Sequence, residues 1–342
     1  MGQKGFFDFQ NREAFLSEKK DTLLHIASLI PWEDFRPILS QIRHKERKSN
    51  AGRKPLDDIL MFKLLVLQNL YNLSDDELEY QANDRLSFMR FLGLGIEDKV
   101  PDSKTIWLFR EQLTRQDLIV ELFEMFDTYL RKNGYQAKGG QIMDATLIPV
   151  PKQHNSKEEN QKLKQGQLPE DWEDHPHKVS QKDTDARWTK KGGQSYFGYK
   201  NHISIDREYR FVRHYDVTDA SVHDSQVLGE LIDFENDENI LWADSAYYSE
   251  LREQVLDLLG IKSEIHERGY RNQPLTQEKK EKNREKSKVR ALVEHVFGSW
   301  ITEMGGKLVR VIGIARVKSV IGLKNIVYNM KRYVYLETCT VV

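Results

Sequence analysis

The sequence has little cysteine and no long apolar run. Its 342 residues include a single cysteine, Cys339, which excludes an internal disulfide framework and any cysteine-rich zinc site. It contains no uninterrupted apolar stretch of about 18 residues, and its N-terminus lacks the apolar segment of a secretory signal. We therefore expect no membrane span, no export and a location in the reducing cytoplasm.

The charges are balanced overall but unevenly distributed. The chain is 31% charged with a formal net charge of -1. Residues 278–333 hold 14 Lys or Arg against five Glu, a net charge of +9, so the remainder carries -10. Local clustering of cations is typical of a surface that binds a polyanion. The alternative for residues 278–288 is an ordinary solvated charged helix.

The first third of the chain has a helical pattern. Large aliphatic residues recur at helical spacing from residue 53 onward, and Gly134 marks the end of the pattern. Five helices are predicted, beginning near residues 55, 74, 84, 103 and 117. Residues 1–135 are therefore predicted to form a helical N-terminal domain, whose short helices leave room for a helix-turn-helix.

From residue 136 the pattern changes to alternating strands and helices. Strands are predicted at 141–150, 196–205, 210–217, 239–243, 262–266 and 307–312, and helices at 223–232, 249–259, 277–302 and 315–335. This order predicts an α/β domain over residues 136–342, with a mixed sheet flanked by helices. A polar insertion at about 155–195 interrupts it, with too few apolar side chains to form a core of its own.

Three carboxylates stand out against this background. Asp144 and Asp244 close apolar strand-like runs, and Glu294 lies on an amphipathic helix. Two-metal phosphodiester chemistry needs hard oxygen ligands around ions about 3.5 to 4 Å apart, and these residues supply them if the two strands are neighbours. Arg290 precedes Glu294 by one helical turn, so it shares its face and is suited to holding a phosphate. A lone Asp after an apolar run is usually a turn or cap residue; the conjunction favours a metal site.

The end of the insertion offers a second group of candidates. Trp188, Lys190 and Lys191 stand beside two glycines, a combination suited to base stacking and phosphate contact. The alternative is a surface loop without function. His175-Pro-His177 in the same insertion lacks the second ligand pair of a zinc site.

Lys200 and two histidines lie near the predicted strand ends. Strand alternation places Lys200 and His202 on one face, where either could contact a substrate. A structural partnership with Asp216 or Asp224 explains them equally well, and His223 is open to the same two interpretations.

Taken together, these residues resemble a bacterial insertion-sequence transposase of the IS5 group, and the resemblance covers most of the chain. It is carried by Gly52-Arg-Lys-Pro55, Phe88-Met-Arg-Phe-Leu-Gly93, Pro101-Asp-Ser-Lys-Thr-Ile106, Met143-Asp-Ala-Thr146, Asp185-Ala-Arg-Trp188, Tyr196-Phe-Gly-Tyr-Lys-Asn-His202, Ala243-Asp-Ser-Ala-Tyr247 and Arg290-Ala-Leu-Val-Glu-His-Val-Phe297.

The resemblance implies a DNA transposase with an RNase H-like catalytic domain. Asp144, Asp244 and Glu294, separated by 100 and 50 residues, would hold two Mg²⁺ ions, for which Mn²⁺ can substitute. The implied partners are the terminal inverted repeats of the element and target DNA, with at least a homodimer on the DNA. The implied location is the bacterial cytoplasm, in association with the nucleoid.

The chain departs from the related signature at two positions. Ser287 and Ile301 stand where a Tyr and a Lys are expected, and Lys307 is the nearest basic residue downstream of Ile301. The predicted DNA contacts are therefore Arg290 and Lys307, together with Trp188, Lys190, Lys191 and Lys200. Two other functions remain open: a structure-specific DNA nuclease of the same fold, and a DNA-binding repressor whose carboxylates are silent.

Overall fold

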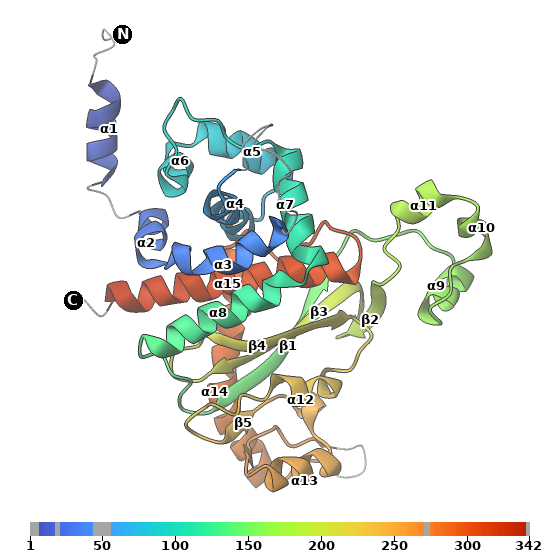
Figure 1. Ribbon diagram of the computed structural model, residues 1–342. Coiled ribbons are helices and arrows are strands. Elements are labelled where there is room, and N and C mark those ends of the chain that lie inside the picture. Colours follow the sequence, from blue (N-terminus) through green and yellow to red (C-terminus); the bar gives the residue numbers. More distant parts are fainter. Residues whose placement is uncertain (1–6, 18–20, 44–55, 270–273, 340–342) are drawn as a thin grey trace.

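The computed structural model describes residues 7–17, 21–43, 56–269 and 274–339 (Figure 1). The motif at 52–55 lies outside the described residues. The elements before the sheet are α1 (Asp8–Ser17), α2 (Thr22–Leu29), η1 (Trp32–Phe35), α3 (Arg36–Leu39), η2 (Ser40–Arg43), α4 (Asp58–Tyr71), α5 (Asp75–Asp84), α6 (Leu86–Leu92), α7 (Ser103–Arg115) and α8 (Leu118–Lys132).

The remainder of the chain carries the sheet and its helices. These are β1 (Gln141–Pro149), α9 (Lys157–Lys164), α10 (Glu170–Glu173), α11 (Pro176–Ser180), β2 (Arg187–Lys191), β3 (Gln194–Asp206), β4 (Val212–Asp219), η3 (Asp224–Gln226), α12 (Leu228–Leu231), β5 (Ile240–Trp242), η4 (Ser245–Tyr247), α13 (Glu250–Leu258), β6 (Lys262–Ser263), α14 (Gln277–Thr302) and α15 (Ile314–Cys339).

Side-chain caps set the beginnings of the predicted helices. Asp57, Ser74 and Asp102 each accept a backbone N–H three residues further on, at the starts of α4, α5 and α7. Such a cap satisfies one of the backbone donors that the first helical turn leaves without a partner. The five helices predicted between residues 53 and 134 are all present.

The sheet is mixed, as predicted. Its order is β2-β3-β1-β5-β6, and β4 also pairs with β3. β3 pairs antiparallel with both β1 and β4, whereas β5 runs parallel to β1 and β6. The predicted fold class, an α/β sheet flanked by helices and preceded by an all-helical region, is confirmed.

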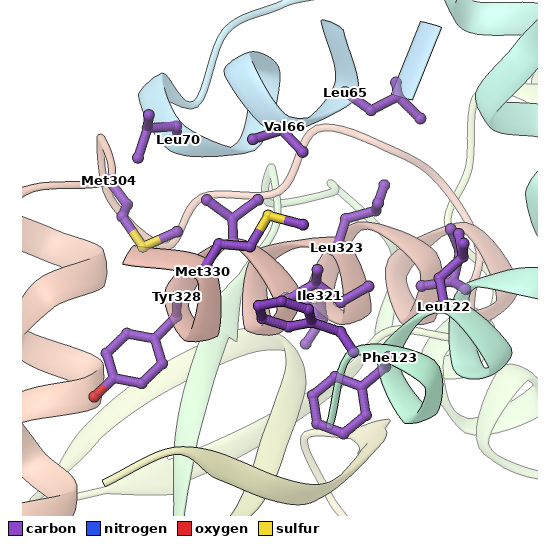
Figure 2. Packing of buried hydrophobic residues seen from close by; sticks show 14 of the residues in the cluster. Leu65, Val66, Leu70, Leu122, Phe123, Met304, Ile321, Leu323, Tyr328 and Met330 are labelled. Atoms are coloured by element: carbon purple, nitrogen blue, oxygen red, sulfur yellow. The ribbon is translucent and has the colours of Figure 1, made fainter. Parts of the chain in front are cut away.

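The C-terminal helix α15 joins the helical region to the sheet. It lies between them in Figure 1, and it packs on α2, α4, α7 and α8 as well as on β4. Figure 2 shows Val66 of α4, Phe123 of α8 and Ile321 of α15 within one buried cluster. Because that cluster also contains Ile142 and Ile203 of the sheet, the two regions share a hydrophobic core.

Two predicted elements are absent or broken up, and the strand predicted at 262–266 is limited to the two residues of β6. Residues 307–312 form no strand: Val309 donates its N–H to Pro149, but Gly306 and Gly313 adopt positive φ on either side, so the segment bends away from the sheet. Residues 223–232, predicted as one helix, form only the short η3 and α12.

The polar insertion has more structure than its composition predicts. It contains α9, α10 and α11, and it ends in β2, which joins the sheet. Trp172 is fully buried there, and its indole N–H donates to Glu159 Oε1 at 2.8 Å. Across the described residues, no helix is long and apolar enough to cross a membrane.

Candidate active site

Asp144 and Asp244 lie on neighbouring parallel strands. Residues 141 and 142 of β1 pair with residues 241 and 242 of β5, two residues before the aspartates, and the charge of Asp244 acts on the Asp144 carboxyl. Asp244 follows the end of β5, as predicted. Asp144 instead lies inside β1, because that strand continues to Pro149 along its other neighbour, β3.

Helix α14 connects Glu294 to Asp144 through Arg290. The helix packs on β1 and β5, and Arg290 donates from Nη1 to Asp144 Oδ2 at 3.0 Å. The other terminal nitrogen of Arg290 lies 3.6 Å from Glu294 Oε1. Asp144 is mostly buried, whereas the Glu294 side chain is 62% exposed. The predicted shared face of Arg290 and Glu294 is confirmed.

The surroundings of Asp144 disfavour its negative charge. Burial raises the pKa of the Asp144 carboxyl, and the neighbouring charge of Asp244 adds to this effect. The N–H of Ala145, the guanidinium of Arg290 and the ammonium of Lys191 act in the opposite direction. A carboxylate in such a place gains from a cation close by.

A second cation reaches β1 from the segment after α14. Lys307 donates from Nζ to Thr146 Oγ1 at 2.6 Å, two residues beyond Asp144, and its ammonium lies 5.1 Å from the centre of the Phe297 ring. Burial lowers the pKa of Lys307, and the charge of Lys191 adds to that lowering, whereas Asp144 opposes it. Lys191 and Lys307 therefore both act on the electrostatics of Asp144.

Comparison with known families decides the class of protein. Residues 135–330 match the profile of the Transposase DDE domain, and residues 10–112 match that of a Transposase domain (DUF772). The chain belongs to the DDE transposase family. DDE transposases cut DNA strands and transfer them, so this chain is an enzyme that acts on DNA by transposition.

One solved structure resembles the transposase at low identity. It is the cryo-EM structure of the piggyBac transposase synaptic complex with hairpin DNA, with 11% identity and a TM-score of 0.43. The match covers 93% of this chain and 76% of that one.

The transposase does not gather its three carboxylates as the sequence predicts. Among the described residues, no three His, Cys, Asp or Glu side chains are close enough to hold a metal ion together. Arg290 instead lies between Asp144 and Glu294 and pairs with both. The same finding applies to the histidines at 175 and 177, which form no zinc site with their acidic neighbours.

The remaining predicted DNA contacts differ in their availability. Trp188 is 41% exposed, and its ring lies 5.2 Å from that of Phe197, while Lys190 and Lys191 project from the β2–β3 hairpin into solvent. Lys200 is instead engaged within the fold: its Nζ donates to Val222 O at 2.6 Å and to Asp224 Oδ1 at 2.8 Å. That is the structural partnership the sequence left open.

Sequence reasoning missed His266, which borders the site. Its backbone N–H donates to Ala243 O at 3.1 Å, and its Nε2 lies 3.4 Å from Ser287 Oγ on α14. Burial lowers the pKa of His266, the charge of Arg290 adds to this, and that of Asp244 opposes it. One signal for His266 was available in the sequence. His266 ends the strand predicted at 262–266, and Asp244 directly follows the strand predicted at 239–243.

Proposed function

We propose that the transposase binds the terminal inverted repeats of an insertion sequence of the IS5 group, cuts a strand there, and joins the freed 3′-hydroxyl to target DNA. Asp144, Asp244 and Glu294 are its proposed catalytic carboxylates. The β1–β5 register supports this most strongly, because its offset of 100 residues sets the part of β1 that carries Asp144 beside the end of β5, which Asp244 follows. Glu294 follows through α14, which packs on the same two strands.

The donor set fits divalent metal ions. Carboxylate oxygens are the ligands that Mg²⁺ and Mn²⁺ prefer, and Mg²⁺ needs few protein ligands because it keeps several waters. We propose two ions, held by Asp144 and Asp244 together with Glu294. When bound, such ions activate a water and stabilise the departing oxygen of the phosphodiester. The burial that disfavours an unpaired Asp144 charge favours a bound cation there.

Cations and an aromatic side chain around the carboxylates would position the DNA. Arg290 contacts Asp144 and Lys307 contacts Thr146, two residues further along β1, and we propose that both cations hold phosphate oxygens. Lys190, Lys191 and Trp188 extend the same surface along the β2–β3 hairpin. Lys200 is the weakest of the six proposed contacts, because it would first have to leave Asp224.

The proposed division of labour follows the two regions of the chain. Residues 1–135 are the proposed DNA-binding domain, and residues 136–342, with the insertion at 155–195, the catalytic domain. A transposition event involves two element ends, so we propose at least a dimer on DNA. Binding should weaken steeply with salt, because Lys and Arg displace counterions from the phosphates.

A strand-transfer assay separates this proposal from its two alternatives. The purified transposase is incubated with Mg²⁺ or Mn²⁺ and a duplex carrying a terminal repeat of its own element. A joined product supports the transposition proposed here. Cutting without joining indicates the nuclease, and a shifted but intact duplex indicates the silent repressor.

The Asp144→Asn substitution tests the carboxylate assignment. We expect it to lower strand cleavage by at least about a thousandfold, because phosphoryl transfer depends on positioning and electrostatics, while duplex binding in a gel-shift assay persists. Asp257→Asn is the matched control, since Asp257 is exposed on α13. Cleavage by Asp144→Asn at the level of this control would remove Asp144 from the site.

A further inference from the structure

Resting on the proposed function, we infer that Arg290 acts as a lock on the metal site: it occupies Asp144 in the free protein and releases it when a DNA phosphate binds the guanidinium. Metal and DNA would then bind cooperatively. The free transposase would hold metal weakly, and the active site would be completed on its substrate.

The lock rests first on the contacts of Asp144. Its Oδ1 accepts the N–H of Ala145 at 2.8 Å, and its Oδ2 accepts Arg290 Nη1 at 3.0 Å. The guanidinium and a metal ion would therefore compete for the lone pairs of Oδ2. The same guanidinium faces Glu294, with 3.6 Å between Nη2 and Oε1.

Burial makes this competition effective. The side chains of Arg290 and Asp144 are only 21% and 18% exposed, so solvent screens their attraction less than that of a surface pair. The guanidinium neutralises a carboxylate that burial disfavours as an anion. In the free protein Arg290 thus already supplies the charge compensation that a metal ion would provide.

The release step follows from the donors of arginine. A guanidinium binds a phosphate best through two parallel N–H groups. Arg290 Nη1 is engaged by Asp144, and its Nε is buried without a hydrogen-bond partner among the described residues. Because Nε is buried, a phosphate that arrives from solvent has the two terminal nitrogens for a two-donor contact, and one of them is the Nη1 that pairs with Asp144. Because coupling is reciprocal, DNA should raise metal affinity as much as metal raises DNA affinity.

Metal affinity measured without any turnover tests the lock. Binding of Mn²⁺ is followed by the electron paramagnetic resonance signal of the free ion, for the transposase alone and with a mixed-sequence DNA duplex, after subtracting the ions that the duplex itself binds. We expect Arg290→Gln to bind Mn²⁺ about tenfold more tightly than the unsubstituted protein without DNA. With DNA, the affinity of the unsubstituted protein should rise and the difference should shrink.

Three further variants make the outcome decisive. Arg284→Gln changes an exposed arginine of the same helix and should leave Mn²⁺ affinity unchanged. Arg290→Lys keeps the charge with a single donor nitrogen and should give an intermediate Mn²⁺ affinity. It replaces Arg290→Gln in the test if Arg290→Gln does not fold. Equal affinity of Arg290→Gln, or of Arg290→Lys in its place, and the unsubstituted protein without DNA would overturn the lock. Unchanged affinity in an Asp144→Asn, Asp244→Asn double variant would instead refute the proposed metal ligands.

Discussion

His202 shows how a buried titratable residue is accommodated inside the sheet. It lies on β3 with its side chain fully buried, and its Nε2 is 2.9 Å from Thr218 Oγ1 on β4. Burial lowers the pKa of His202 to about 4, from an ordinary value of 6.5. The imidazole is therefore neutral in the folded protein at neutral pH.

The depressed pKa of His202 predicts a loss of stability in mild acid. Between pH 6.5 and 4 the unfolded chain binds a proton at His202 that the folded protein does not, so the free energy of unfolding falls as the pH falls through this window. The expected loss has an upper limit of about 3 kcal/mol. Urea unfolding at pH 5 and pH 7 should show a smaller difference for His202→Gln, whose amide keeps a polar group near Thr218. If His202→Gln showed the same difference in unfolding free energy between pH 5 and pH 7 as the unsubstituted protein, His202 would not be the source of the acid sensitivity.

The candidate site was predictable at some residues and not at others. Asp144 and Asp244 were found because a charge after an apolar strand-like run is rare inside a sheet, and Arg290 because helical spacing fixes its face. The contact between Lys307 and Thr146 joins residues 161 apart in a segment wrongly predicted as a strand. No local sequence pattern predicts such a contact. Nor does any local pattern predict the pairing of Arg290 with Asp144.

Among the elements, helices were predicted better than short strands. The predicted bounds of α14 agree with the observed Gln277–Thr302, because Thr276 caps its start and its charged and apolar residues follow a helical period. β5 and β6 have only three and two residues in their ladders, and pairing with neighbours rather than local preference defines them. The insertion was the largest miss, since the helices it forms depend on the burial of Trp172.

Helix α15 packs so closely on its neighbours that a single glycine matters. A Cβ added at Gly322 would lie 2.4 Å from the Tyr215 hydroxyl of β4 and 2.6 Å from Ile119 Cγ2 of α8. A Cβ added at Gly298 on α14 would meet no atom within 4 Å apart from its chain neighbours and the backbone of its own helix. The two helical glycines therefore offer a matched pair.

We expect Gly322→Ala to destabilise the protein and Gly298→Ala to stabilise it. Alanine favours a helix over glycine by about 1 kcal/mol, but overpacking costs about 1 to 3 kcal/mol at a crowded position. The clash should outweigh the helix preference at Gly322, whereas only the preference acts at Gly298. Thermal unfolding of both variants checks this. A higher midpoint for Gly322→Ala would show that α15 can move away from β4.

At the scale of the molecule, an ionic network as well as the shared core joins the helical region to the sheet. Arg213 of β4 is fully buried and donates to Asp206 Oδ1 at 2.8 Å, to Asp127 Oδ1 on α8 at 2.7 Å and to Tyr135 O at 2.7 Å. Arg131 of α8 continues the network from Asp127. The catalytic sheet and the helices before it are thus held as one unit.

Because the network is buried, removing its central cation should affect the whole fold. Arg213→Met would leave the carboxylates of Asp206 and Asp127 without their shared partner, and breaking a buried pair costs about 3 to 5 kcal/mol. Arg316→Met is the control. Arg316 also joins distant segments, by pairing with Glu111 of α7, but its side chain is 43% exposed and the buried Glu111 keeps a second partner in Arg115, so its loss should cost less than that of Arg213. Urea unfolding should show one cooperative transition that shifts far more for Arg213→Met. Equal shifts, or a helical region that unfolds separately in the unsubstituted protein, would show that burial of this network does not join the two regions.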